Sequence, residues 1–387
     1  MKRIKIDERP GWRDAADKLG FTWHHLDGAR YWDERAYYAF TLKEVEEDLE
    51  EPARELHAMC LELVDEVSKS EALMAKLAIP EASRDDVAAS WAAKAPSLYG
   101  RFDFAYDGTG PAKLFEYNAD TPTSIYETGT FQWLWLEEAI KAGRLPADAD
   151  QFNSLHEKLA ARFKAIFPAG GFVHFACDPD FVEDRQTVRY LEDIASQAGI
   201  DPKFVPVASI GLDGEGRFVD QDNFLIHWVF KLYPWEDMFR EDYGPKIKAA
   251  KTQFLEPAWK AILSNKGMLP LLWERHAGHP NLLPAYFEDD PRSAELANSY
   301  VRKPLFSREG ANIELVDEGR RARVLDQGYG EEGHIRQALH TLTAFDGNYP
   351  VVGAWMVDAE PAGIGIREDR SRVTKNLSRF VPHAIVG

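Results

Sequence analysis

The sequence predicts an α/β protein whose C-terminal third is rich in strands. Apolar residues between Val45 and Val67 recur at helical spacing with charged residues between them, which is typical of an amphipathic helix. A strand, a helix and a second strand follow one another between residues 172 and 207, which favours a βαβ unit and a partly parallel sheet. Beyond residue 300, several short segments have the pattern of strands.

The same patterns place each element along the chain. Helices are expected at residues 45–67, 131–142, 155–167, 187–198 and 254–263. Strands are expected at residues 172–177, 203–207, 224–232, 300–306, 312–316, 351–358 and 363–366, the last two being candidates for an antiparallel pair. No repeat and no linker rich in Gly, Pro or Ser separates these elements. We therefore expect residues 1–387 to form closely interlocked lobes.

Composition excludes several classes of protein. The net charge is −18, so the surface should repel nucleic-acid phosphates and attract cations, including polyamines. Cys60 and Cys177 are too few and too distant for a disulfide framework or a zinc site, and we expect buried thiols. The sequence has neither an apolar signal core nor an apolar run that could span a bilayer, which predicts a cytoplasmic protein without membrane contact.

The most informative segment is a pair of alternating strands at residues 101–106 and 113–118, joined by a turn rich in glycine. If the hairpin is symmetric about that turn, Asp103 lies opposite Glu116 and Arg101 lies opposite Asn118, with all four on one face. The other face then presents an aromatic set to the core, which consists of Phe102, Phe104, Phe115 and Tyr117.

Two facing carboxylates are destabilising unless a cation neutralises them. Oxygen ligands such as those of Asp103, Glu116 and Asn118 suit Mg²⁺, which also accepts oxygens from phosphates. Arg101 could then hold a phosphoryl group or a substrate carboxylate in forked geometry. The polar loop at residues 118–124 could hydrogen-bond a small ligand. The alternative is an ordinary hairpin with one solvated polar face.

Positive charge elsewhere is needed to make this a nucleotide site. Lys303 lies in an otherwise apolar strand just before the polar loop at residues 307–312, where it could reach phosphates. Lys266 lies in a turn after a helix, and Arg367 lies near a strand end where it could complement an anion. For each of the latter two, a solvated surface position is the competing interpretation.

Several familiar sites are missing. The sequence contains no Gly-x-x-x-x-Gly-Lys-Ser/Thr phosphate loop, and no Gly-x-Gly-x-x-Gly motif directly follows an expected strand, which argues against P-loop and dinucleotide-binding folds. It also lacks Gly-x-Ser-x-Gly and His-Glu-x-x-His, which argues against serine hydrolases and zinc proteases.

Taken together, these motifs resemble the glutathionylspermidine synthase family, in its synthetase domain. The most specific match is the hairpin, Arg101-Phe-Asp-Phe followed by Phe115-Glu-Tyr-Asn-Ala-Asp-Thr. Weaker matches follow in the same order over nearly the whole chain, at residues 233–236, 264–266, 301–304, 310–316 and 365–369.

The resemblance implies an ATP-grasp-like C-terminal region with a preceding α/β domain of the pre-ATP-grasp type, and ATP and Mg²⁺ as cofactors. It also implies roles for the matching residues. Asp103, Glu116 and Asn118 would bind Mg²⁺, and Lys266 and Lys303 would bind ATP. Arg101 and Arg367 would stabilise the transferring phosphoryl group and the acyl phosphate, and Thr121, Thr123 and Arg308 would lie around the peptide substrate.

Bifunctional members carry an N-terminal cysteine amidase domain, which we do not expect here. The chain resembles the stand-alone branch, whose acid and amine need not be glutathione and spermidine.

The resulting hypothesis is an ATP-dependent acid–amine ligase. ATP phosphorylates a substrate carboxylate, and an amine then displaces phosphate to form an amide. The candidate substrates are a glutathione-like peptide and a polyamine. Glu236 and Glu127 are candidates for the base that takes the amine proton, and the loop around Arg308 could close over the site. The alternatives are a ligase with another amine acceptor, such as an amino acid, and a homologue that binds nucleotide without turnover.

Overall fold

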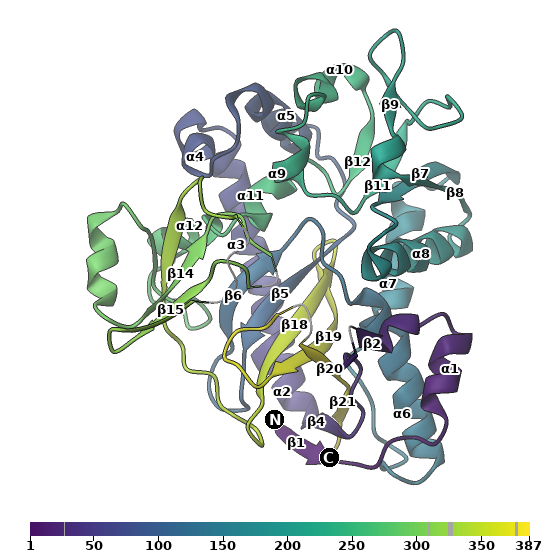
Figure 1. The fold of residues 1–387 in the computed structure, drawn as a ribbon, viewed down its shortest axis with the longest axis vertical. Coiled ribbons are helices and arrows are strands. Elements are labelled where there is room, and N and C mark those ends of the chain that lie inside the picture. The colour runs from purple at the N-terminus through teal and green to yellow at the C-terminus, as the bar shows by residue number, and fades with distance from the viewer. Residues whose placement is uncertain (27, 309, 324–327, 376–377) are drawn as a thin grey trace.

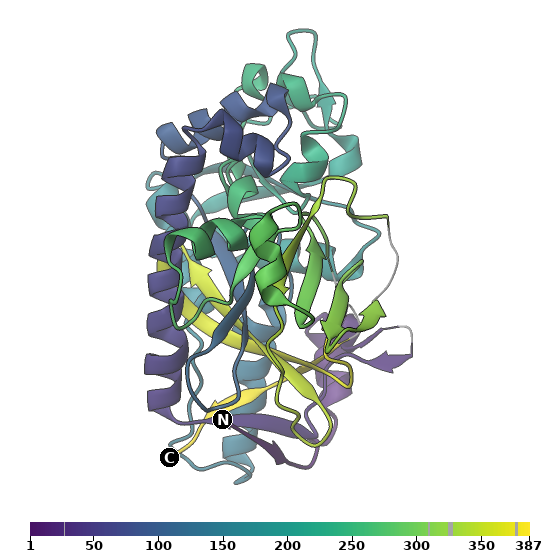
Figure 2. The ribbon, with the colours of Figure 1, turned by 90° about the vertical axis from the view of Figure 1, so that its left-hand side faces the viewer.

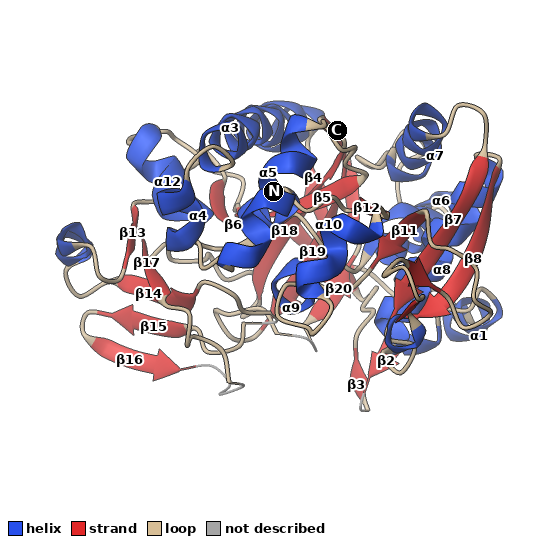
Figure 3. Ribbon diagram, turned by 90° about the horizontal axis from the view of Figure 1, so that it is seen from above, coloured by secondary structure: helices blue, strands red, loops and turns tan. Residues whose placement is uncertain are grey.

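The computed structural model describes residues 1–26, 28–308, 310–323, 328–375 and 378–387. Its centre is an antiparallel sheet of order β20-β19-β18-β5-β6 (Figure 1). A second antiparallel sheet, β13-β17-β14-β15-β16, and a parallel sheet, β12-β11-β7-β8, lie on opposite sides of the central sheet (Figure 3). The two ends of the chain meet in a small sheet, β1-β4-β21.

The bounds of the elements are as follows. The helices are α1 (Trp12–Lys18), α2 (Leu42–Val45), α3 (Glu51–Val67), α4 (Glu71–Lys76), α5 (Glu81–Ala92), α6 (Gln132–Lys141), α7 (Leu155–Ile166), α8 (Val182–Gln197), α9 (Trp235–Met238), α10 (Ile247–Ala250), α11 (Lys260–Ser264) and α12 (Met268–Arg275). Short 3₁₀ or π turns are η1 (Thr22–His24), η2 (Glu46–Glu50), η3 (Glu127–Phe131), η4 (Val207–Ser209), η5 (Gly244–Lys246) and η6 (Pro291–Leu296). The strands are β1 (Lys2–Lys5), β2 (His25–Leu26), β3 (Ala29–Arg30), β4 (Ala36–Phe40), β5 (Tyr99–Ala105), β6 (Lys113–Asn118), β7 (Gly171–Cys177), β8 (Ile200–Pro206), β9 (Gly211–Leu212), β10 (Phe218–Val219), β11 (Trp228–Lys231), β12 (Gln253–Leu255), β13 (Ala285–Phe287), β14 (Tyr300–Pro304), β15 (Glu314–Asp317), β16 (Arg320–Arg323), β17 (His334–Ala338), β18 (Tyr349–Val357), β19 (Glu360–Asp369), β20 (Arg379–Val381) and β21 (His383–Ile385).

The amphipathic helix predicted at residues 45–67 forms as α2, a π turn and α3. The side chain of Thr41 accepts a hydrogen bond from the backbone N–H of Glu44, while the Glu44 carboxylate accepts from that of Thr41, a capping box that begins the helix. The predicted apolar positions are buried, and α3 runs along the central strands (Figure 2). The packing of this helix thus supports the central sheet from one side.

The βαβ unit is confirmed, because β7 and β8 pair in parallel with α8 between them. The antiparallel pair near the C-terminus is also confirmed as β18 and β19. Both cysteines are buried and free, as expected. Among the described residues no helix is both long and apolar enough to cross a membrane. The cytoplasmic location stays a prediction.

The helix predicted at residues 254–263 is wrong in its first half. Gln253–Leu255 form β12, which pairs with β11, and the helix α11 begins only at Lys260. Pro257 disfavours helical geometry at the residue before it, so the apolar run divides into a strand and a helix. The strand predicted at 224–232 is shorter than expected, because only Trp228–Lys231 pair with neighbours in the parallel sheet.

Candidate active site

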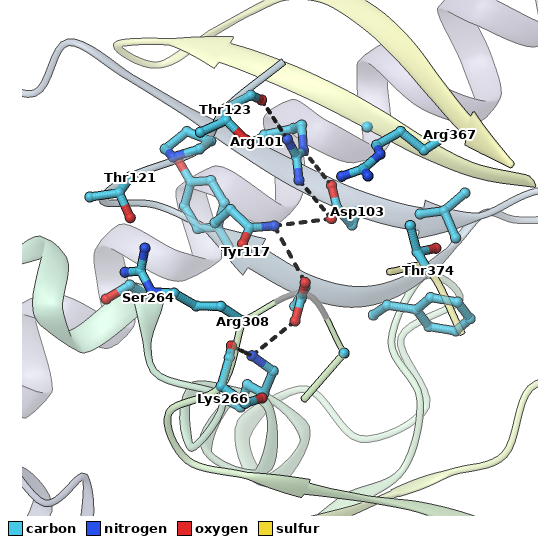
Figure 4. A pocket seen from close by; sticks show the side chains of 18 of the residues that line it. Arg101, Asp103, Tyr117, Thr121, Thr123, Ser264, Lys266, Arg308, Arg367 and Thr374 are labelled. Carbon is cyan, nitrogen blue, oxygen red and sulfur yellow. Dashed lines mark hydrogen bonds and ion pairs between the residues drawn. The ribbon is translucent and has the colours of Figure 1, made fainter. Parts of the chain in front are cut away.

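A cavity of about 510 Å³ lies where the central sheet, the β14 sheet and the turn after α11 meet. Figure 4 shows its inner surface, with Arg101 and Asp103 on one wall and Lys266 and Arg308 on the other. The residues to which the resemblance assigns a role in binding metal, nucleotide or substrate all line this cavity, namely Arg101, Asp103, Glu116, Asn118, Thr121, Thr123, Lys266, Lys303, Arg308 and Arg367. Residues up to 266 positions apart in the chain are therefore brought to one site.

The predicted register of the hairpin is confirmed. Arg101 pairs with Asn118, and Asp103 pairs with Glu116, across β5 and β6. The opposite face is buried, and the rings of Phe102 and Tyr117 stack there with centroids 3.9 Å apart. The hydrophobic face anchors the hairpin and thereby presents its polar face to the cavity.

The prediction that Phe115 enters the core is wrong. The register shifts between Asp103 and Phe104, so that Phe104 pairs with Leu114 and Phe115 becomes the extra residue of a β-bulge. Leu114 is fully buried in place of Phe115, whose ring lines the cavity instead. The bulge therefore turns Phe115 and Glu116 toward the same site.

The two facing carboxylates are neutralised by different cations of the protein. Arg101 Nε lies 2.6 Å from Asp103 Oδ1, and Lys266 Nζ lies 3.1 Å from Glu116 Oε2. Burial by itself would raise the pKa of Glu116, but Lys266 and Lys303 outweigh it and lower the value to about 2. Glu116 is thus ionised at any ordinary pH.

The hairpin face fits a divalent cation. The amide nitrogen of Asn118 lies 3.0 Å from Asp103 Oδ2 and 3.5 Å from Glu116 Oε1, so one atom already lies close to both carboxylates. Within the described ranges, no group of three His, Cys, Asp or Glu side chains is placed to bind a metal. Two carboxylates and an amide suit Mg²⁺, which commonly binds few protein ligands and completes its shell with water and phosphate oxygens.

Lys303 reaches the cavity from β14. Its ammonium donates hydrogen bonds to the carbonyl of Phe115 at 2.9 Å and to Gln337 Oε1 at 2.8 Å. Burial lowers the pKa of Lys303 to about 8. The positive charge of Lys266 lowers this pKa further, whereas the negative charge of Glu116 raises it. Gln337 is a site residue that the sequence did not indicate, because nothing local reveals that β17 will pair with β14.

Lys266 is held by the turn after α11, as predicted. Its ammonium donates to the carbonyl of Ser307 at 2.8 Å. The turn is tight, since a Cβ at Gly267 would lie 2.6 Å from Leu77 Cδ2. Asn265 closes the turn by accepting from the backbone N–H of Gly267 at 2.7 Å. These contacts direct Lys266 across the cavity toward Glu116.

The two arginines occupy different parts of the site (Figure 4). Arg101 donates to the carbonyl of Thr123 at 2.8 Å, and its guanidinium carbon lies 5.4 Å from the ring centroid of Trp355. Arg367, on β19, donates to the carbonyls of Lys375 and Ser378. Thr121 and Thr123 belong to the loop after β6 and line the wall next to Arg101.

The two candidate bases are placed differently. Glu236 lines the cavity, and its Oε1 lies 3.4 Å from Arg308. Its Oε2 is buried with no hydrogen-bond partner among the described residues. Glu127 is buried behind the wall, where it accepts a hydrogen bond from Trp23 Nε1 at 2.8 Å. Part of the predicted polar loop at residues 307–312, Glu309, lies outside the described residues.

Comparison with known proteins decides the family. A sequence profile described as "Glutathionylspermidine synthase preATP-grasp" matches residues 3–386. The chain belongs to the glutathionylspermidine synthase family. Members of this family are ATP-dependent carbon–nitrogen ligases, and so is this protein. Dependence on ATP implies a divalent metal as well.

Relatives in the family differ in length. A Haemophilus influenzae protein named "Putative acid--amine ligase" is 39% identical over 403 residues, covering 100% of both chains. Trypanothione synthetase of Crithidia fasciculata is 30% identical, over 84% of this chain and 53% of its own. The bifunctional glutathionylspermidine synthetase/amidase of Escherichia coli is 29% identical, over 97% of this chain and 63% of its own. The chain thus spans between half and two thirds of the length of the last two relatives.

A solved structure supports the fold. A glutathione synthetase-like effector from Globodera pallida, in its apo form, superimposes with a TM-score of 0.55 over 98% of both chains at 13% identity. The predicted α/β fold of the ATP-grasp type is therefore confirmed.

Proposed function

We propose that this ligase joins a substrate carboxylate to an amine through an acyl phosphate, using ATP and Mg²⁺, with a glutathione-like peptide and a polyamine as the leading substrates. The observation that carries the proposal is the meeting of the hairpin's polar face with Lys266 and Lys303 in one cavity. Phosphoryl transfer is catalysed chiefly by positioning and charge, which is what this arrangement provides.

The nucleotide half of the site is built from the two lysines and the hairpin. Lys266 and Lys303 carry positive charge toward the phosphates, while Asp103, Glu116 and Asn118 would hold Mg²⁺. When bound, Mg²⁺ would supply positive charge that offsets the negative charge of the carboxylates and the phosphates. Both lysines now contact Glu116 or the bulge beside it, so a bound triphosphate meets side chains that are already positioned.

The transferring phosphoryl group lies, in this proposal, between Arg101 and Arg367. Arg101 makes a forked pair with Asp103 and donates a further hydrogen bond to the Thr123 carbonyl. These contacts fix its guanidinium in place while negative charge develops on the phosphoryl group. Its planar guanidinium suits a phosphoryl or carboxylate oxygen pair. Thr121, Thr123 and Arg308 would hold the acid substrate beside it.

The amine half of the site is acidic. The cavity wall formed by the segment entering α8 and by α9 carries carboxyl groups at Asp178, Glu183, Asp184, Glu236 and Asp237. Burial and the neighbouring Glu236 raise the pKa of Asp237, which is typical of crowded carboxyl groups. A chain bearing several ammonium groups would relieve this crowding, which favours a polyamine over an uncharged acceptor.

The test is a panel of acids and amines monitored by ADP release. Glutathione with spermidine or putrescine should release ADP and form an amide that mass spectrometry detects. If ADP is released only with amino-acid acceptors, the amine substrate is an amino acid rather than a polyamine. A crystal structure with an ATP analogue and Mg²⁺ should place the triphosphate between Lys266 and Lys303, and a triphosphate bound elsewhere would overturn the assignment of this site.

A further inference from the structure

A chain of hydrogen-bonding side chains leads from the cavity wall into the protein. Ser124 Oγ lies 3.4 Å from Glu183 Oε1 at the wall, and 3.0 Å from the hydroxyl of Tyr31 behind it. The Tyr31 hydroxyl in turn lies beside the Glu127 carboxylate, and the two groups interact electrostatically. We call this set the inner relay, and it consists of Glu183, Ser124, Tyr31 and Glu127.

The inner end of the relay is closed to solvent. Glu127 has 1% of its surface exposed, and Tyr31 also 1%. Glu127 begins a π turn, η3, an irregularity that is frequent at functional sites and that directs its carboxyl group inward. An ionisable carboxyl group placed so deep, with Trp23 as its side-chain hydrogen-bond donor, is costly for stability alone.

The middle of the relay is strained and firmly held. Ser124 has φ of 70°, which is unfavourable for a residue with a Cβ. Its carbonyl accepts hydrogen bonds from the backbone N–H and the hydroxyl of Thr128, and these contacts fix the strained conformation. Strain of this kind persists where the surrounding structure imposes it and gathers at functional sites. Here it holds the Ser124 hydroxyl between Glu183 and Tyr31.

We propose that the inner relay carries to Glu127 the proton that the amine loses as the amide bond forms. The inference rests on the proposed ligase function. An ammonium nitrogen with three hydrogens becomes an amide nitrogen with one. The C–N bond forms while the C–O bond to phosphate breaks, one proton leaves with phosphate as HPO₄²⁻, and the other must go to the protein. Glu183 receives it at the wall, and the hydroxyls of Ser124 and Tyr31 each pass on a proton until Glu127 becomes neutral.

The charges around Glu127 suit a proton acceptor. Burial, and then repulsion from Glu183, raise the pKa of Glu127 to about 7, while the hydrogen bond from Trp23 and the neighbouring Tyr31 hydroxyl oppose the rise. Tyr126, next to it in the chain, also faces this carboxylate, and Arg367 faces Tyr31. Efficient acid–base groups have a pKa near the working pH, so Glu127 can both accept and release a proton.

Glu236 is the competing acceptor, since it too lines the cavity. It is paired with Arg308, whose pKa it helps to raise against the effect of burial. Its contact with Arg308 suits Glu236 to binding an ammonium group or to holding Arg308 in place. The two glutamates therefore predict different behaviour on substitution.

The experiment compares two nucleophiles with the same ATP and glutathione. Spermidine enters as an ammonium ion and must give a proton to the protein, whereas hydroxylamine is neutral at pH 7 and releases only the proton that leaves with phosphate. Glu127→Gln should lower kcat with saturating spermidine by about 10²-fold or more, while hydroxamate formation keeps the wild-type rate. In the wild type, kcat with spermidine should fall as pH drops below about 7, because Glu127 then already holds a proton. This fall should be absent in Glu127→Gln.

Two further variants separate proton transfer from a structural role. Tyr31→Phe keeps the ring but removes the hydroxyl, and it should reproduce the selective loss with spermidine. Glu127→Asp should recover part of that activity. Glu236→Gln should raise KM for spermidine and leave the acidic limb of the kcat profile in place.

The outcomes are distinguishable. Equal losses with both nucleophiles in Glu127→Gln and Tyr31→Phe would overturn the relay and make Glu127 a structural anchor for Trp23. If Glu236→Gln, and neither of the other variants, shifts the pH below which kcat with spermidine falls, the proton acceptor is Glu236. If the wild type forms no hydroxamate with any acid tested, the reaction has no acyl-phosphate intermediate, and both proposals are wrong.

Discussion

Asp103 and Glu116 face each other across the β5–β6 hairpin, yet each carboxylate is neutralised by a different cation. Asp103 is paired with Arg101 on its own strand, and Glu116 is paired with Lys266 from the turn after α11. The hairpin face therefore keeps like charges side by side without a net repulsive cost. The proposed metal and nucleotide would enter a site whose charges are already balanced and positioned.

The first prediction concerns these two carboxylates. Asp103→Asn and Glu116→Gln keep side-chain shape but weaken the proposed Mg²⁺ site, so each should lower ADP release by about 10²-fold or more. The measurement is acid- and amine-dependent ADP release at several Mg²⁺ concentrations, with circular dichroism to verify folding. Glu360→Gln, an exposed carboxylate at the start of β19, is the matched control and should have wild-type activity. Wild-type rates in both site variants would contradict the metal assignment.

The second prediction concerns Lys303. Because its pKa is lowered to about 8 and bound phosphates favour the charged form, nucleotide binding should take up a proton above that pH. The affinity for ATP should then fall by up to about tenfold per pH unit above about 8, as measured by calorimetry. Lys303→Ala should bind ATP weakly at every pH. In Lys303→Arg, the affinity for ATP should no longer depend on pH in this range. If the pH dependence remains unchanged in that variant, another group is responsible for it.

The β-bulge leads to a third prediction, in which two neighbours respond differently. Leu114 is fully buried, so Leu114→Ala should lower the free energy of unfolding by about 2–5 kcal/mol. Phe115 lines the cavity, so Phe115→Ala should cost much less stability and should instead weaken nucleotide binding. Urea denaturation and calorimetry measure the two effects. The opposite ranking in stability would mean that the hairpin is regular in solution.

The fourth prediction concerns Gly353, which pairs with Asp103 from β18. A Cβ there would lie 2.7 Å from Arg101 Cδ, so Gly353→Ala should push the guanidinium out of its forked pair with Asp103. We expect kcat to fall by about 10²-fold while ATP affinity changes little, because a small displacement of a positioning group is costly. Gly214→Ala is the control, since nothing lies within 4 Å of a Cβ at that position. A wild-type kcat in Gly353→Ala would show that the position of Arg101 does not depend on the absence of a side chain at Gly353.

Local patterns were enough to predict the helices at residues 45–67, 131–142, 155–167 and 187–198, the βαβ unit and the pairing of the hairpin's polar residues. Alternation along residues 101–106 and 113–118 determined which side chains share a face, because successive side chains of a strand point to opposite sides. The bulge at Phe115 was not predictable in this way, because a bulge depends on how the strand pairs with its neighbours rather than on its own pattern. The helix expected at residues 254–263 was wrong in its first part, where Pro257 disfavours a helix and the residues before it pair with β11.

The amino-acid sequence by itself determined the α/β class, the acidic face of the hairpin and the types of residue available for phosphate and metal. These follow from periodicity and side-chain chemistry, which act over a few residues. Only the tertiary structure decided that Lys266, Lys303 and Arg367 meet that face in one cavity, and that Gln337 supports Lys303. Glu127 likewise gained its raised pKa only from burial and from Glu183 across the fold. Contacts between distant segments depend on sheet pairing and core packing, which local sequence patterns do not record.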